Sequence, residues 1–170
     1  MHLYMKTFPQ AVTHNGQRCD VVHVDTDSFA DLDDTLIEKA HAVCMHENKL
    51  LLVSHPEWNI WSIPGGTRES GETIDETLRR EIQEETNCSV ISSVPISYEK
   101  IIDNEGNFHY RVQYFCQVVP MGAFESDVAG NINKIDWVDP FKFEEYIEKK
   151  EFKKATLQRV IDNLSYYANL

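Results

Sequence analysis

Three glutamates lie close together in the sequence, and the spacing of Glu81, Glu84 and Glu85 suits metal chemistry. On a helix, where successive side chains turn by about 100°, Glu81 and Glu85 fall on the same arc as the apolar side chains and Glu84 borders that arc. Carboxylates at these spacings repel one another, and turning them toward the interior costs free energy unless a cation compensates. The cluster therefore predicts a site for a hard cation such as Mg²⁺, which binds carboxylate, water and phosphate oxygens.

The helix that must carry these glutamates is marked at both ends. Thr73 and Glu76 form a capping box at its start, and Asn87, which tolerates the left-handed conformation, follows its predicted last turn. We therefore expect a helix over residues 74–86, with one side facing the core and the other in solvent. The apolar side consists of Ile74, Leu78 and Ile82, and the side expected in solvent consists of Asp75, Glu76, Arg79, Gln83 and Thr86.

A glycine-rich loop, residues 64–71, precedes this helix. Glycine permits backbone conformations that are closed to other residues, so Gly65 and Gly66 can bring backbone amides and carbonyls close to a metal ion or a phosphate. Arg80 is expected to form an ion pair with Glu72 that ties the loop to the helix.

Residues 66–88 resemble the Nudix box, which reads G-x5-E-x7-R-E-U-x-E-E-x-G-U with U an apolar residue. Every charged position matches at the family's spacing, and the one departure is Asn87 in place of the final glycine. Weaker likeness extends to the strand and turn before the box, residues 61–66, and to the late strand at residues 135–140.

The resemblance implies an α/β fold, a Nudix-type α/β/α sandwich with a mixed central sheet. It also implies Mg²⁺-dependent hydrolysis of the diphosphate linkage in a nucleoside diphosphate derivative: a nucleotide, a dinucleotide or a nucleotide sugar. Mn²⁺ is the alternative ion. By the same resemblance, Glu81, Glu84 and Glu85 hold the metal together with the carbonyl of Gly65, while Gly66, Glu72 and Arg80 support the site.

The general base is less well marked than the metal ligands. Many family members have a glutamate six residues before the late tryptophan, and this sequence has Asn131 at that position. Glu81, Glu84 and Glu125 are the candidates for catalysis, and Asp127 lies in the same loop as Glu125.

Substrate contacts are expected from aromatic and basic side chains near the box. Trp61 and Tyr110 are candidates to stack on a base, and Arg68 is a candidate phosphate ligand, with Arg111 a further basic residue in a predicted strand. The expected partner is a small molecule, and family members are often homodimers, so a homodimer is an assembly to test.

Two other functions fit parts of the sequence. An RNA 5'-end pyrophosphohydrolase shares the chemistry, but a net charge of −12 opposes a long nucleic acid contact, so we expect no nucleic acid partner. A Nudix-like sensor that binds nucleotides without hydrolysis usually loses glutamates of the box, and this sequence retains all of them.

The elements around the box alternate between strands and helices. Residues 1–35 are expected to form an N-terminal extension with a hairpin at Asn15-Gly16, and residues 36–170 the Nudix hydrolase domain. Strands are predicted at 38–45, 49–53, 60–63, 89–96, 98–103, 108–118 and 134–138, and helices at 140–149 and 152–167.

Composition indicates a globular protein. The chain has 170 residues, of which 42% are hydrophobic, with no apolar run as long as a membrane span. Its start lacks a secretory signal, so we expect a cytoplasmic protein without a membrane partner. The four cysteines form no C-x-x-C pair and are expected to be reduced, mostly buried thiols.

Overall fold

The structure, a computed structural model, describes residues 4–12, 16–57, 60–125, 127, 132–147, 151–167 and 169, with only the backbone for 151–153. Its strands form one mixed sheet in the order β1-β2-β7-β8-β3-β4-β5, with β6 paired to β3 and β9 to β4. The strands are β1 (Met5–Val12), β2 (Arg18–Asp25), β3 (Ile37–His46), β4 (Lys49–His55), β5 (Ile60–Ser62), β6 (Gly65–Thr67), β7 (Cys88–Ile102), β8 (Phe108–Pro120) and β9 (Lys134–Val138). β3 runs parallel to β8, which makes the sheet mixed.

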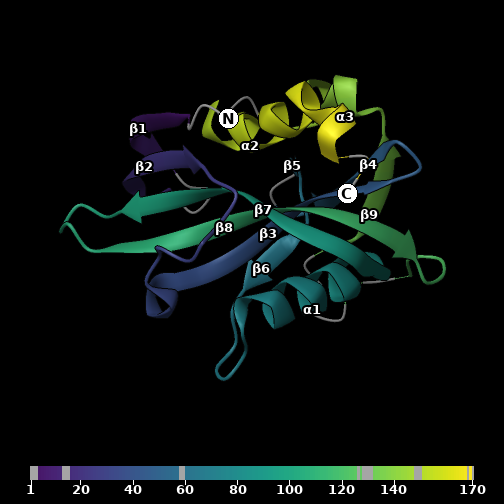
Figure 1. The fold of residues 1–170 in the computed structure, drawn as a ribbon, viewed down its shortest axis with the longest axis horizontal. Helices are drawn as coiled ribbons and strands as arrows, with labels where there is room; N and C mark the ends of the chain where they lie inside the picture. The colour runs from purple at the N-terminus through teal and green to yellow at the C-terminus, as the bar shows by residue number, and fades with distance from the viewer. Residues whose placement is uncertain are drawn as a thin grey trace.

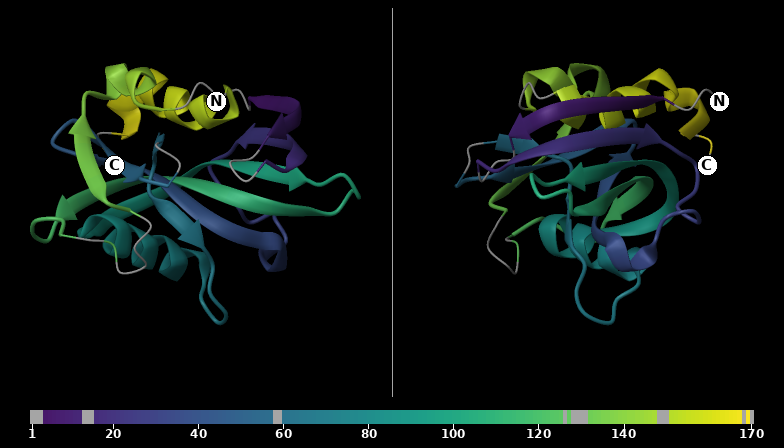
Figure 2. Two further views of the ribbon diagram at one scale, coloured as in Figure 1. Left: turned by 180° about the vertical axis from the view of Figure 1, so that it is seen from behind. Right: turned by 90° about the vertical axis from the view of Figure 1, so that its left-hand side faces the viewer.

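Helices cover both faces of this sheet (Figure 1). α1 (Ile74–Thr86) lies on one face, while α2 (Glu151–Asp162) and the short α3 (Leu164–Tyr167) lie on the other, as the views from behind and from the side also show (Figure 2). Two short 3₁₀ helices, η1 (Asp34–Leu36) and η2 (Pro140–Glu145), complete the elements. The predicted α/β/α sandwich with a mixed sheet is confirmed.

Two hydrophobic clusters hold these layers together. On the α1 face, Leu78 and Ile82 pack with Ala40 and Ala42 of β3. On the α2 face, Leu157 packs in a second cluster whose strand residues include Val43 and Phe115. Because neighbouring residues of a strand point to opposite faces, the alternation of β3 assigns each of its side chains to one layer.

The N-terminal strands continue the same sheet. β1 pairs antiparallel with β2, and β2 pairs antiparallel with β7. Asn15 of the predicted turn lies outside the described residues. The division of the chain at residue 35 stays a prediction.

Several element boundaries differ from the sequence prediction. The two strands predicted at 89–96 and 98–103 form one continuous strand, β7 (Cys88–Ile102), because bulges at Val90/Ser92 and Pro95/Ser97 absorb Pro95, which has no amide hydrogen to donate. The stretch predicted as a helix at 140–149 is the 3₁₀ turn η2, after which residues 148–150 lie outside the described part. The last predicted helix is interrupted at Asn163 and forms α2 and α3.

Within the described residues, no helix is both long and apolar enough to cross a bilayer. The four cysteines are all buried, and Cys44 of β3 lies opposite Cys116 of β8.

Candidate metal and active site

The helix α1 begins and ends where its capping residues predict. The Thr73 hydroxyl accepts a hydrogen bond from the Glu76 amide, and the Glu76 carboxylate accepts one from the Thr73 amide at 2.7 Å. At the other end Asn87 adopts the left-handed conformation, with φ 53° and ψ 36°. Since Asn takes this conformation more readily than most residues, it replaces the usual glycine of the box without changing the helix end.

The three glutamates of α1 differ in how far they face the interior. Glu85 is 7% exposed, whereas the side chains of Glu81 and Glu84 are 14% and 35% exposed. The prediction that Glu81 and Glu85 turn inward while Glu84 borders the buried side is therefore confirmed.

Thr86 corrects the sequence prediction, which placed it in solvent. It is 1% exposed, and its hydroxyl donates to the Ile82 carbonyl. The last turn of α1 leads directly into β7, whose first residue, Cys88, is also buried. Thr86 therefore lies in the interior, where α1 meets β7.

The glycine loop approaches the glutamates closely. The Gly65 amide donates a hydrogen bond to Oε2 of Glu85 at 2.8 Å, and its φ of +139° favours glycine. A Cβ atom added to Gly66 would lie 2.4 Å from the Glu81 carboxylate. Residues 65–67, predicted as a loop, form β6 against β3, and this pairing fixes the distance between loop and helix.

Negative charge is concentrated where these elements meet. The pKa of Glu85 is raised to about 8, mainly by burial and also by the carboxylates of Glu81, Asp127 and Glu84, while the hydrogen bond from the Gly65 amide opposes this rise. Burial also raises the pKa of Glu81, which Arg80 opposes. An oxygen-rich site that holds its charge at such a cost suits a divalent cation.

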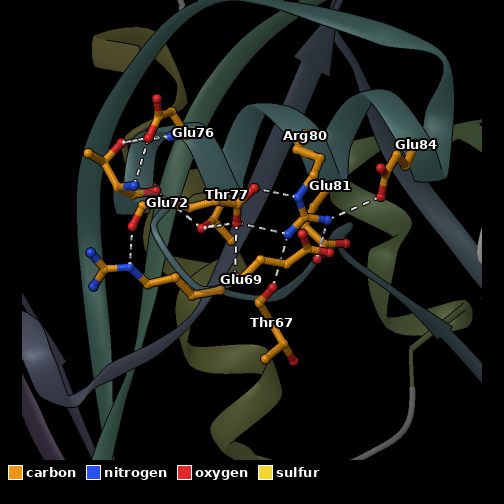
Figure 3. Close-up of polar contacts among 10 residues, drawn as sticks. Thr67, Glu69, Glu72, Glu76, Thr77, Arg80, Glu81 and Glu84 are labelled. Carbon is orange, nitrogen blue, oxygen red and sulfur yellow. Dashed lines mark hydrogen bonds and ion pairs between the residues drawn. The ribbon is translucent and has the colours of Figure 1, made fainter.

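Arg80 connects three of the carboxylates (Figure 3). Its Nε and Nη2 atoms donate to the two carboxylate oxygens of Glu72 at 2.7 and 3.1 Å, so the predicted ion pair is confirmed. Its Nη1 atom also donates to Glu81 at 3.0 Å and Glu84 at 3.1 Å. Hydrogen bonds to the Glu72 carboxylate, first those from Arg80 and then those from the Glu69 amide and the Thr77 hydroxyl, hold its pKa near 2.

Within the described part of the chain, no three acidic, histidine or cysteine side chains are already grouped to hold a metal. Glu81 and Glu84 are instead hydrogen-bonded to Arg80. The donor set still fits Mg²⁺, because it consists of carboxylate oxygens around a glycine cradle that a Cβ atom would fill. Each contact with Arg80 uses one carboxylate oxygen, Oε1 of Glu81 and Oε2 of Glu84, and leaves the second oxygen of each group outside that contact.

Arg68 is held in place by the protein itself. Its Nε atom donates to the Glu72 carbonyl at 2.7 Å, and its Nη atoms donate to the carbonyl and carboxylate of Asp34, both at 2.9 Å. Arg68 thus ties η1 to the glycine loop. Its contact with substrate phosphate stays a prediction.

The two aromatic residues predicted to stack on a base are not brought together. Trp61 of β5 packs on the α2 side, edge-on to Tyr146. Tyr110 of β8 packs on the α1 side, edge-on to Tyr98 and Phe108. Base stacking by either residue stays a prediction, and the two residues cannot face one base from both sides.

The loop after β8 carries Glu125 and Asp127, two acidic residues considered as alternatives for the general base. Glu125 is exposed and lines a cavity of about 720 Å³ together with Arg80, Gln83, Glu84, Asn87, Gly122 and Ala123. Asp127 is buried, and its carboxylate accepts a hydrogen bond from the Ile132 amide at 3.1 Å. Its charge contributes to the raised pKa of Glu85. Asn131 lies outside the described residues.

Comparison with known proteins agrees with this geometry. Residues 37–160 match the family model described as NUDIX domain. The protein named uncharacterized Nudix hydrolase YvcI, from Bacillus subtilis (strain 168), is 36% identical over 52 residues, and that match covers 31% of this chain and 33% of the relative.

Solved structures share the fold. The Bacillus subtilis pyrophosphohydrolase BsRppH is 17% identical with a TM-score of 0.63, over 97% of this chain and 94% of that one. A NUDIX hydrolase from Nitrosomonas europaea is 21% identical with a TM-score of 0.57, over 77% of this chain and 90% of that one.

Proposed function

Because the chain belongs to the Nudix hydrolase family, we propose that it is a Mg²⁺-dependent enzyme that cleaves the diphosphate linkage of a nucleoside diphosphate derivative. The observation that supports this proposal most strongly is the position of Glu85. It is buried beside the Gly65 amide, and the carboxylates of Glu81, Glu84 and Asp127 all raise its pKa. Such an arrangement is costly for folding, and it becomes favourable when a cation is bound.

The residues that would hold Mg²⁺ are Glu81, Glu84 and Glu85, with the Gly65 carbonyl as a further oxygen ligand. When bound there, the ion supplies positive charge to phosphate oxygens and makes a water molecule more acidic. Arg80 and Glu72 position the carboxylates, because Arg80 contacts Glu72, Glu81 and Glu84 at once.

The proton of the attacking water needs an acceptor among the acidic residues of the site. Of the three candidates, Glu84 and Glu125 line the cavity of about 720 Å³, whereas Glu81 lies against Gly66. We therefore propose that Glu84 or Glu125 takes this proton as the general base.

A substrate panel tests the proposal. Nucleoside triphosphates, dinucleoside polyphosphates, nucleotide sugars and a 5'-triphosphorylated RNA are each incubated with the protein and Mg²⁺, and released phosphate and nucleotide are measured. Glu84→Gln and Glu85→Gln are each expected to lower kcat/KM at least roughly 100-fold. The matched control is Glu69→Gln, which changes an exposed glutamate in the glycine-rich loop before α1 and should retain full activity. Unchanged turnover in both active-site variants would rule the mechanism out, and nucleotide binding without turnover by the wild type would favour the sensor.

A further inference from the structure

Asn87, the one residue of the box that departs from the family pattern, makes contacts with its side chain as well as its backbone. The family has a glycine at this position, and glycine has no side chain, whereas Nδ2 of Asn87 donates a hydrogen bond to the Ala123 carbonyl at 3.0 Å. The Asn87 carbonyl also accepts a hydrogen bond from the Met121 amide at 2.9 Å. The end of α1 is therefore joined at two points to the loop that follows β8.

Both contacts depend on the conformation in which α1 ends. Asn87 has φ 53° and ψ 36° and precedes Cys88, the first residue of β7, which pairs with Pro120 at the end of β8. This pairing brings the start of the loop to Asn87, and the asparagine side chain extends the contact to Ala123. A residue that makes both contacts must tolerate the left-handed conformation and carry a side-chain donor, and glycine meets only the first condition.

The loop that Asn87 holds carries Glu125. Glu125 lies two residues after Ala123, so their Cα atoms can be no more than about 7 Å apart. Two residues further along, Asp127 is buried, and its carboxylate accepts a hydrogen bond from the Ile132 amide at 3.1 Å. Glu125 therefore lies between two anchored residues of the loop, on the wall of the cavity of about 720 Å³.

The surroundings of the two candidates for the general base differ. Glu84 accepts a hydrogen bond from Arg80 at 3.1 Å and is also a proposed metal ligand. A carboxylate next to two cations takes up a proton less readily than one in solvent, and Glu125 is exposed to solvent. This difference favours Glu125 as the acceptor of the water's proton.

We propose that Asn87 is a positioning residue, whose side chain holds the loop after β8 so that Glu125 stays on the cavity wall as the general base. This inference rests on the proposed function and selects one of its two candidate bases. A general base must lie within hydrogen-bond reach of the water that it deprotonates, and a displacement of about 1 Å can lower the rate up to roughly 100-fold. Without the Asn87 hydrogen bond, the exposed loop would hold Glu125 in this position for less of the time.

Asn87→Gly, which introduces the residue usual in the family, tests this role. Glycine keeps the left-handed helix end and the backbone contact with Met121, and it lacks the donor to Ala123. With Mg²⁺ and the panel substrate that the wild type hydrolyses fastest, kcat should fall roughly fivefold or more, while KM changes less than about twofold.

The matched control is Asn48→Gly. Asn48 is also left-handed, with φ 61°, and it lies in the exposed turn between β3 and β4. This variant should keep the wild-type kcat. Equal kcat values for the wild type and Asn87→Gly, or an equal loss in Asn48→Gly, would overturn the inference.

A double variant distinguishes the positioning of Glu125 from a general loosening of the site. Glu125→Gln removes the base and should lower kcat roughly 100-fold. Adding Asn87→Gly to Glu125→Gln should then lower kcat by less than about twofold further, because there is no base left to position. If Glu125→Gln keeps the wild-type kcat, or if the two losses multiply in full, Asn87 does not act through Glu125.

Nuclear magnetic resonance relaxation measures the loop without any substrate. Asn87→Gly should lower the order parameters of the backbone amides of Ala123 and Glu125, and Asn48→Gly should leave them unchanged. The unfolding temperature of Asn87→Gly should stay within about 4 °C of the wild type, since one hydrogen bond is lost but glycine favours the left-handed helix end. Unchanged order parameters in Asn87→Gly would contradict the proposed anchoring.

The inference and the proposed function can fail separately. If the wild type hydrolyses no substrate of the panel, the proposed function fails, and the role of Glu125 as a base fails with it. If hydrolysis requires Glu85 but neither Asn87→Gly nor Glu125→Gln lowers kcat, the proposed function stands and the inference alone is wrong.

Discussion

At the scale of single residues, the close approach of Gly66 to Glu81 is the most sensitive feature of the site. A Cβ atom at residue 66 would lie 2.4 Å from the Glu81 carboxylate, so Gly66→Ala must displace one proposed metal ligand. We expect kcat to fall at least roughly tenfold, with a smaller effect on stability. Gly122→Ala is the control, because its Cβ atom would meet its nearest neighbour only at 3.4 Å. Equal kcat values for the wild type and Gly66→Ala would show that Glu81 is not held by this contact.

Replacing Glu85 with Gln should stabilise the protein when no metal is present, and it should remove the stabilisation that Mg²⁺ gives the wild type. Without metal at pH 7, Glu85 must take up a proton when the protein folds, because its pKa is raised from 4.5 to about 8, and Glu85→Gln removes this cost, so its free energy of unfolding should rise by about 1–3 kcal/mol. With saturating Mg²⁺, only the wild type should gain stability. Urea denaturation with EDTA and with Mg²⁺ measures both effects. An equal gain from Mg²⁺ in both proteins would remove Glu85 from the set of metal ligands.

At the scale of elements, Glu72 and Arg80 join the glycine loop to α1, and their ion pair makes this junction sensitive to acid. The pKa of Glu72 is near 2, below its ordinary value of 4.5, so the ionised form stabilises the fold. This contribution is complete above pH 4.5 and is lost as the pH falls from there toward 2. Gln at this position has no carboxylate to protonate. Between pH 6 and pH 3 the unfolding temperature of Glu72→Gln should therefore fall less than that of the wild type.

The natural control for this experiment is Glu69→Gln, a change in the same loop whose side chain forms no described contact with Arg80. It should follow the wild-type curve. If Glu72→Gln and the wild type lose stability in parallel, the ion pair does not hold the loop to the helix.

The elements also differ in how far the sequence could predict them. The ends of α1 and the inward turn of Glu85 follow from local signals, a capping box and a helical period, and both are present. β6 was missed because its three residues form a strand only by pairing with Lys39 to His41 of β3, a contact made across the fold. Thr86 was misplaced for a similar reason, since the chain after it folds back over the helix end.

The residues of the site show the same division. Glu81, Glu84, Glu85, Arg80 and Glu72 stand in one segment, so their spacing alone brought them together in the prediction. Asp127 was left as a second choice, because only the packed loop places it near Glu85.

At the scale of the whole molecule, the net charge of −12 opposes long polyanions. We expect kcat/KM for 5'-triphosphorylated RNA to stay level or fall as the RNA is lengthened from two to twenty nucleotides, about the range in which backbone contacts would add affinity. Nucleoside triphosphate hydrolysis provides the reference rate. A rise with RNA length that disappears in high salt would instead point to an RNA-binding surface.

The central claim is that the inward-facing glutamates of α1 bind the divalent cation on which hydrolysis depends. Titration with Mn²⁺, with the free ion followed by electron paramagnetic resonance, measures this binding directly. The account predicts that the wild type and the Glu69→Gln control bind Mn²⁺ alike, and that Glu85→Gln binds it at least roughly tenfold more weakly. Equal Mn²⁺ binding by the wild type and Glu85→Gln, or no binding by either, would contradict it.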